Sequence, residues 1–124
     1  MLRVGSIVLG VEDVPRSITF WEQAVGYQLR EEPDDDWATL VSPTGTGSQI
    51  ALMRSESPLQ AHPRIHVDLY ATDRGTEITR LLELGATQVA WDSYPENPDF
   101  VVLADPDGNL FCVIEKDGDW IGFR

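Results

Sequence analysis

The chain has a single cysteine, Cys112, among its 124 residues. One cysteine cannot form an internal disulfide, which fits a reducing compartment. Long apolar runs are also missing, because the 42% of residues that are hydrophobic never gather into the roughly 20-residue stretch that a membrane-spanning helix needs. The N-terminus has no basic region followed by a cleavable apolar one. These absences predict a soluble, cytoplasmic protein with no place in a membrane.

Basic residues are scarce in this chain. Nine Lys and Arg stand against 21 Asp and Glu, which gives a formal net charge of -12. A field of this sign repels phosphate backbones and anionic lipids, so we expect neither nucleic acid nor a membrane as a partner. Two interpretations of the charge stay open: it concentrates a cationic ligand, or it is a solvated surface that aids solubility. The acidic run at 31–36 is expected to be an exposed loop.

The length suits one domain, because 124 residues bury a sizeable core but not two independent ones. Residues 7–11 alternate in a way that predicts a strand with one buried face. A helix is expected between Asp13, as its N-cap, and Gly26, as its left-handed C-cap. Two further strands are expected at 37–41 and 49–53, joined by the turn-rich segment SPTGTGS.

The same pattern then starts again, which indicates an internal repeat. Apolar residues alternate from Ile65 to Leu69, which predicts a strand with His66 inside it. A second helix is expected between Asp73 and Gly85. The segments AVGYQL and TLVSPTG of the first half correspond to LGATQV and VLADPDG of the second, at an offset of roughly sixty residues.

Each half is therefore predicted to be a β-α-β-β-β module within one domain that spans 1–124. Module 1 covers about 1–56 and module 2 covers about 62–117. The predicted fold class is α+β, with the two tandem modules forming a curled mixed sheet around a cavity. The segment WDSYPENPD at 91–99 is expected to be a loop that lies over whatever the sheet encloses.

Several segments together resemble a known superfamily. VEDVPRSITFWEQAVGYQL, HVDLYATD, LLELGATQV and VVLADPDGNLFCVIE resemble the vicinal oxygen chelate superfamily, which includes glyoxalase I, extradiol dioxygenases and bleomycin-resistance proteins. The likeness is greatest to small glyoxalase-like domain proteins, and it covers nearly the whole chain. This resemblance implies paired β-α-β-β-β modules and a homodimer. In the enzymes it also implies one divalent metal held by His, Gln or Glu side chains from the first and last strands of each module.

The metal ligands that the resemblance implies are mostly missing from this chain. His66 occupies the ligand position of the second module and is the only well-placed candidate. Cys112 stands where the enzymes usually have a glutamate. In the first module Ser6 matches His66, and only Gln49 has a ligating side chain. Because a catalytic ion generally needs three protein ligands, no metal cofactor is favoured, and a divalent metal is kept as the alternative.

The candidate ligand site lies on the cavity face of the sheet. His66 and Asp68 are its polar groups and its candidate catalytic residues. A pairing of His66 with Cys112 is a further alternative. In a purely structural role, His66 would be a residue of the cavity wall that is hydrogen-bonded to a neighbour such as Tyr70. Asp68 either pairs with a cationic ligand or forms an ion pair with Arg64 or Arg74. The predicted ligand-binding residues are His66, Asp68, Tyr70, Phe100, Val102, Cys112, Trp37 and Trp91.

The tryptophans allow two interpretations. Trp21 falls in phase with the helix core. Trp37 and Trp91 either cover an edge of the core or line an entrance, where a cation can also be held by its contact with the ring. Trp120 is expected at a chain end or a dimer contact.

Three functions remain open. The favoured one is a binding protein for a small organic molecule, cationic or neutral, that needs no metal. The second is a metal-dependent lyase, isomerase or dioxygenase of the glyoxalase class. The third is a metal-free acid-base enzyme that uses Asp68 and His66. Whether the protein is an enzyme stays open, because function depends on the site and not on the fold.

Overall fold

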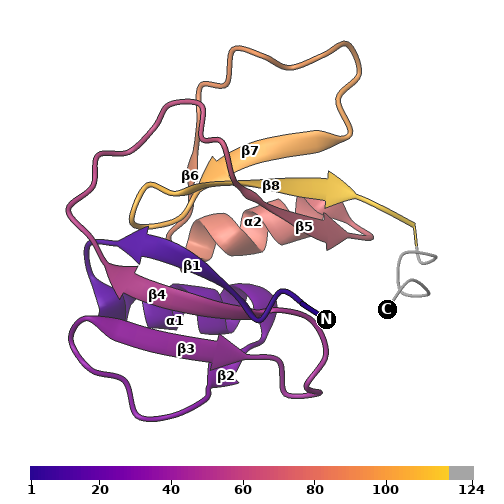
Figure 1. The fold of residues 1–124 in the computed structure, drawn as a ribbon. Coiled ribbons are helices and arrows are strands. Elements are labelled where there is room, and N and C mark those ends of the chain that lie inside the picture. Colours follow the sequence, from indigo (N-terminus) through magenta and orange to yellow (C-terminus); the bar gives the residue numbers. More distant parts are fainter. Residues whose placement is uncertain (118–124) are drawn as a thin grey trace. The chain divides into compact units, whose positions relative to one another are not determined.

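The computed structural model describes residues 1–117, which divide into two units, Met1–Pro58 and the described part of Leu59–Arg124. The first unit consists of β1 (Ser6–Val11), α1 (Val14–Val25), β2 (Gln28–Leu29), β3 (Trp37–Val41) and β4 (Gln49–Arg54). Its strands form a mixed sheet in the order β1-β4-β3-β2, in which only β1 and β4 run parallel. Helix α1 covers one face of this sheet (Figure 1).

The second unit repeats this topology. It consists of β5 (Val67–Ala71), α2 (Arg74–Leu84), β6 (Thr87–Gln88), β7 (Phe100–Ala104) and β8 (Leu110–Glu115). The strand order is β5-β8-β7-β6, with β5 and β8 parallel, and α2 covers one face (Figure 1). The predicted α+β fold of two repeated β-α-β-β-β modules is therefore confirmed. No helix in the described part of the chain is long and apolar enough to span a membrane.

Both helices begin and end at the residues that the sequence predicts. The Asp13 carboxylate accepts a hydrogen bond from the backbone N–H of Arg16 at 3.0 Å, and the Asp73 carboxylate accepts one from Thr76 at 3.1 Å. Each satisfies an N–H that has no partner within its own helix. Gly26 and Gly85 close the helices with φ of 72° and 118°, a conformation that side-chain-bearing residues rarely adopt.

The core of each unit lies between the helix and the sheet. In the first unit Phe20 and Trp21 are only 2% and 1% exposed and meet edge to face at 5.1 Å. This confirms the prediction that Trp21 belongs to the helix core. In the second unit Phe111 and Val113 are each 1% exposed. Because side chains alternate along a strand, the intervening residue Cys112 points to the opposite face of the sheet.

The turn between β7 and β8 is organised by a buried carboxylate. Asp105 is 2% exposed, and its Oδ1 accepts hydrogen bonds from the backbone N–H of Asp107 at 3.0 Å and of Asn109 at 2.8 Å. The backbone of Asp105 also exchanges bonds with Asn109 and Gly108. The DPDGN motif is therefore a self-bonded turn that fixes where β8 starts.

One predicted strand boundary is wrong. The strand expected to run through Ile65 and His66 begins at Val67, and Ile65 is 82% exposed instead of facing the helix. The pairing of β5 with β8 starts with Val67 opposite Phe111, although β8 itself begins at Leu110. His66 therefore sits just before the strand and not within it.

Candidate functional site

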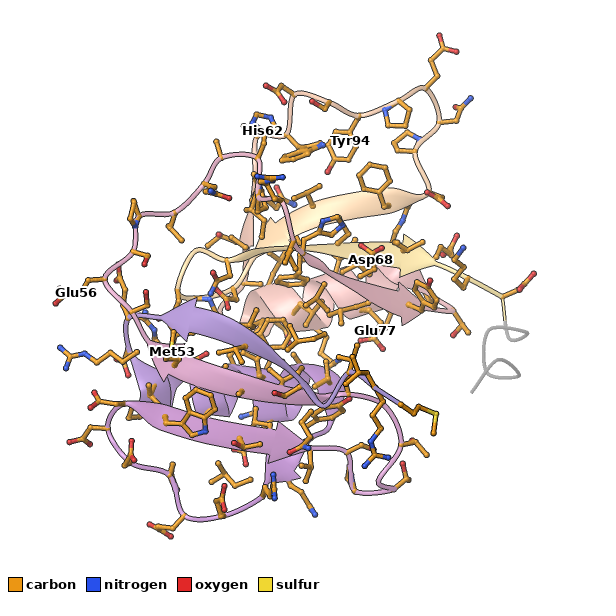
Figure 2. All side chains as sticks on the ribbon, in the orientation of Figure 1. Met53, Glu56, His62, Asp68, Glu77 and Tyr94 are labelled. Carbon is orange, nitrogen blue, oxygen red and sulfur yellow. The ribbon has the colours of Figure 1, made fainter. Side chains whose placement is uncertain are left out.

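His66 and Asp68 form an ion pair on the second unit. The distance from His66 Nε2 to Asp68 Oδ1 is 3.0 Å, and the two side chains are 45% and 42% exposed. Asp68 lies in β5, and Figure 2 shows it on the sheet of this unit. The hydrogen-bonding partner of His66 is thus Asp68 and not Tyr70. Arg74 does not pair with Asp68, because its guanidinium donates to the carbonyl of Pro98 at 3.3 Å.

Cys112 lies directly beside this pair. The parallel register of β5 and β8 sets it opposite Asp68, so its thiol lies beside the Asp68 carboxylate. Burial, followed by the negative charge of that carboxylate, raises the pKa of Cys112 from 9.0 to about 11. The thiol is therefore protonated at neutral pH and is a poor nucleophile in this state. The ligating atoms of His66, Asp68 and Cys112 all lie within 4.8 Å of one another.

We call the face of the second sheet that points away from α2 its distal face; it carries Asp68, Tyr70, Phe100, Val102, Cys112 and Ile114. The register pairs Tyr70 with Ile114 and Ile114 with Phe100, so these three side chains share one face across three strands. Val102 is 3% exposed and Tyr70 is 40% exposed. The Lys116 ammonium lies 5.4 Å from the centre of the Tyr70 ring. The distal face thus combines aromatic and aliphatic side chains with one carboxylate.

The loop before β7 lies along the outer edge of that strand. The backbone N–H of Val102 donates to the Tyr94 hydroxyl at 2.8 Å, and the Tyr94 ring lies 5.3 Å from that of Phe100. Residues 91–99 were predicted to be a loop over whatever the sheet encloses. Tyr94 of this loop instead contacts the edge of β7 at Val102, which β6 is too short to reach. No pattern in the sequence singled out Tyr94, although an aromatic residue in a polar loop was a usable signal.

Trp91 is placed by a second histidine. Its ring lies 4.9 Å from that of His62, and His62 Nε2 lies 2.9 Å from the Asp92 carboxylate. The hydrogen bonds from His62 and then Ser93 lower the pKa of Asp92. Figure 2 shows His62 and Tyr94 outside the strands of this unit, in contrast to Asp68. The described neighbour of Trp91 is His62, so its assignment to the ligand site stays a prediction.

The first unit offers few ligating groups at the matching positions. Its register pairs Val8 with Ala51, as the second unit pairs Asp68 with Cys112, and Ser6 is the counterpart of His66. Trp37 starts β3 on the face that carries Ala51, and its indole N–H donates to the Thr39 hydroxyl at 3.0 Å. Its place in the ligand site also stays a prediction.

The three donors on the second unit fit one class of metal. An imidazole, a carboxylate and a thiolate together suit a borderline-soft ion such as Zn²⁺, and they suit Mg²⁺ or Mn²⁺ poorly because those ions prefer oxygen ligands. His66, Asp68 and Cys112 are close enough together to hold such an ion. Binding it requires the Cys112 proton to leave, since the thiolate is the ligand.

A pocket on the first unit was not predicted. It has a volume of about 490 Å³ and lies beside the turn between β3 and β4, where Arg3, Arg30 and Gln49 reach into it. Arg3 and Arg30 are two of only nine basic residues in this acidic chain, and this scarcity was the one feature of the sequence that could have drawn attention to them.

Comparison with known proteins identifies the family. Residues 6–114 match the model of the family described as the glyoxalase-like domain. The chain therefore belongs to the glyoxalase-like domain family, and the predicted relationship to the vicinal oxygen chelate superfamily is confirmed. No curated protein matches the sequence.

Solved structures share the fold at low sequence identity. A glyoxalase/bleomycin resistance protein/dioxygenase family enzyme from Burkholderia phytofirmans PsJN aligns with a TM-score of 0.73 and 15% identity, over 92% of this chain and 98% of that one. A superfamily member from Sphaerobacter thermophilus DSM 20745 aligns with a TM-score of 0.66 and 22% identity, over 94% and 98%. The bleomycin-binding protein from bleomycin-producing Streptomyces verticillus, solved with copper(II)-bleomycin, aligns with a TM-score of 0.59 and 19% identity, over 94% and 98%.

Proposed function

We propose that this glyoxalase-like protein is a cytoplasmic binding protein for a small, positively charged organic molecule, and that binding needs no metal. The observation that carries the proposal is the Asp68 carboxylate, which is 42% exposed among the aromatic and aliphatic side chains of the distal face. A ligand cation reaches this carboxylate, while Tyr70 and Phe100 offer ring surfaces for its apolar part.

The charge of the chain and one structural relative add support. The net charge of -12 attracts cations over a long range. The Streptomyces verticillus protein that shares the fold holds copper(II)-bleomycin, so this architecture accommodates an organic ligand. At the matching positions of the first unit, Ser6, Val8 and Ala51 offer neither imidazole, carboxylate nor thiol, and Gln49 is left as the one candidate ligand of this module.

Asp68→Asn tests the proposal, because it removes the charge and keeps the shape. We expect it to weaken the binding of cationic aromatic compounds about fivefold, which corresponds to about 1 kcal/mol for a partly exposed ion pair. Tryptophan fluorescence and nuclear magnetic resonance titrations measure this, with benzylammonium and neutral benzyl alcohol as a first matched pair. Asp92→Asn is the control, because Asp92 is also an exposed carboxylate paired with a histidine.

Two results would overturn the proposal. One is a set of cationic aromatic compounds that gives no saturable response with the unaltered protein. The other is equal weakening by Asp68→Asn and Asp92→Asn, which would mean that the loss follows the net charge and not the site.

A metal-dependent enzyme of the glyoxalase class is the second candidate, and the cluster of His66, Asp68 and Cys112 favours it. When bound, an ion would supply a Lewis acid beside the distal face. Inductively coupled plasma mass spectrometry on protein purified without chelators or a histidine tag separates the two candidates. Metal far below one equivalent supports the metal-free proposal. About one equivalent that is lost in His66→Ala but kept in His62→Ala would overturn the metal-free proposal and favour the alternative.

A further inference from the structure

The pocket on the first unit is lined by cationic and neutral groups only. It has a volume of about 490 Å³, within the range of ligand pockets, and no Asp or Glu lines it. Its polar lining comes from Arg3, Arg30, Ser42 and Gln49, with Gly45 and Gly47 in the adjoining turn. All its lining residues belong to Met1–Pro58, so it shares no residue with the Asp68 site of the second unit.

The two arginines lack the ion pairs that other arginines in this chain have. Arg54 Nη1 lies 3.7 Å from Asp36, and Arg80 Nη2 lies 2.7 Å from Glu77. Within residues 1–117 neither Arg3 nor Arg30 is paired with a carboxylate. A chain with 21 acidic residues against nine basic ones has ample carboxylates to pair them, yet two of those nine point into one pocket without a counter-ion.

Backbone pairing holds the groups of the pocket in place. Arg30 continues the line of β2, because its backbone N–H donates to the Thr39 carbonyl at 2.9 Å. Its Nη1 then donates to Gln49 Oε1 at 3.1 Å. The backbone N–H of Gln49 donates to the Gly5 carbonyl at 3.3 Å, which holds the segment that carries Arg3 beside β4.

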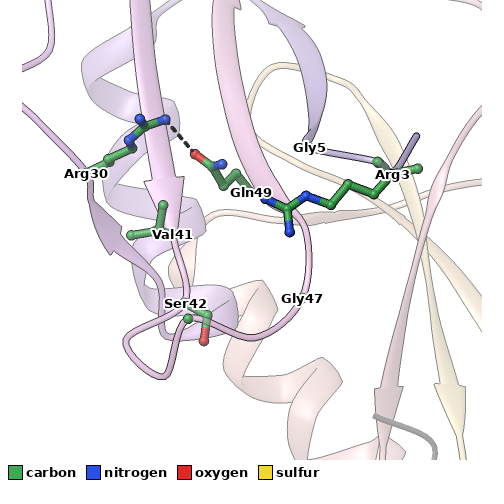
Figure 3. Close-up of a pocket in the computed structure, with 9 residues that line it drawn as sticks. Arg3, Gly5, Arg30, Val41, Ser42, Gly47 and Gln49 are labelled. Carbon is green, nitrogen blue, oxygen red and sulfur yellow. Dashed lines mark hydrogen bonds between the residues drawn. The ribbon is translucent and has the colours of Figure 1, made fainter. Parts of the chain in front are cut away.

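Gln49 acts as a spacer between the arginines. Figure 3 shows its side chain between Arg30 and Arg3. Because its oxygen accepts from Arg30, its amide NH₂ remains available to donate into the pocket. Gln49 was the one candidate metal ligand of this module, and its oxygen is here turned to a guanidinium.

Two glycines of the turn line the pocket with backbone alone. Gly45 and Gly47 have φ of 75° and 82°, which side-chain-bearing residues adopt only with strain. The Gly45 N–H donates to the Ser42 carbonyl at 3.0 Å, and this fixes the turn. A ligand therefore meets backbone, a hydroxyl, an amide and two guanidinium groups.

We infer that this pocket binds the anionic group of a small organic molecule, either a carboxylate or a phosphate ester. Guanidinium groups bind both anions through paired, charge-assisted hydrogen bonds, and two of them with an amide donor surround such a group on several sides. The site is independent of the proposed function, because it shares no residue with the Asp68 cluster and takes a ligand group of opposite charge.

Nuclear magnetic resonance titration of the isotopically labelled full chain tests this inference. The probes are benzoate, phenyl phosphate, neutral benzyl alcohol and benzylammonium, which share a ring and differ in charge. We expect saturable shifts at the amides of Gly45, Gly47 and Gln49 and at Arg30 Nε with at least one anion, and none with benzyl alcohol. The two anions separate a carboxylate site from a phosphate site.

Substitutions locate the response. Arg3→Gln together with Arg30→Gln is expected to weaken binding of the anion about tenfold or more, and Arg30→Lys less, because lysine lacks the planar fork. Arg54→Gln removes one positive charge from the same unit outside the pocket, as Arg3→Gln alone does within it, and is expected to change affinity by less than about twofold. Arg3 lies before β1, outside the sheet. The single substitution Arg3→Gln therefore replaces the double variant in this test if the double variant does not fold.

Three outcomes would overturn the inference: no saturable response to either anion, an equal response to benzyl alcohol, or equal weakening by Arg54→Gln. The variant Asp68→Asn distinguishes this inference from the proposed function. It is expected to leave the anion response unchanged, whereas it weakens binding of the cation at the distal face of the second sheet.

Discussion

The Asp68 carboxylate couples two titratable neighbours. It faces the His66 imidazole at 3.0 Å and lies beside the Cys112 thiol. Burial of the thiol, together with the negative charge of Asp68, holds the thiol in its neutral form. Asp68, which the sequence predicted together with His66 as a polar group of the site, lies between the other two members of the cluster in its contacts.

The raised pKa of Cys112 gives a prediction for its reactivity. Because alkylation needs the thiolate, the rate with iodoacetamide should rise with a midpoint near pH 11 and not near 9. In Asp68→Asn the midpoint should move down toward the usual value, since one cause of the shift is gone. The single cysteine makes mass spectrometric detection unambiguous. An ordinary midpoint in the unaltered protein, or an identical one in Asp68→Asn, would contradict this account.

The raised pKa of Cys112 also predicts how the stability of the fold changes with pH. The unfolded thiol ionises near its ordinary pKa of 9.0, whereas the folded one ionises near 11. The unfolded state therefore loses its proton first as pH rises, and the contribution of Cys112 to stability is complete below 9.0 and lost as pH rises through about 11.

At the scale of elements, the N-cap of α1 gives a testable prediction for the stability of the fold. Asp13→Ala removes the acceptor for the Arg16 N–H and should lower the free energy of unfolding by about 1 kcal/mol, with a drop of a few degrees in Tm. Asp13→Asn keeps a good cap and should lose much less. Thermal unfolding followed by circular dichroism measures both. Equal losses in the two variants would show that charge and not capping is responsible.

The turn at 105–109 shows how one element sets another. Asp105 binds the backbone N–H groups of Asp107 and Asn109, and this fixes the first residue of β8. The parallel pairing with β5 then starts at Val67. His66 therefore lies just ahead of the paired residues of β5.

For the whole molecule, the resemblance implies a homodimer, and the charge predicts how it responds to salt. Each chain carries a formal net charge of -12, so two chains repel each other at low ionic strength. Light scattering after size exclusion should give twice the chain mass of 13.8 kDa at moderate salt, and self-association should weaken as salt is removed. A mass of one chain at every salt and protein concentration would contradict the dimer.

The sequence by itself determined the repeat, the two capped helices and the family. Asp13, Gly26, Asp73 and Gly85 act through neighbours in the chain, so local chemistry was enough to place them. Alternation along strands likewise assigned Asp68 and Cys112 to one face. These features depend on residues close together in the chain, and sequence patterns report such spacing directly.

Only the tertiary structure decided which groups meet. The register of β5 and β8 sets Asp68 against Cys112, and their pairing starts only after His66. Arg3 and Arg30 share a pocket because β1, β3 and β4 bring the N-terminal segment to the turn after β3. Such contacts depend on pairing between distant segments, and a one-residue change of register would turn every side chain of a strand to the other face.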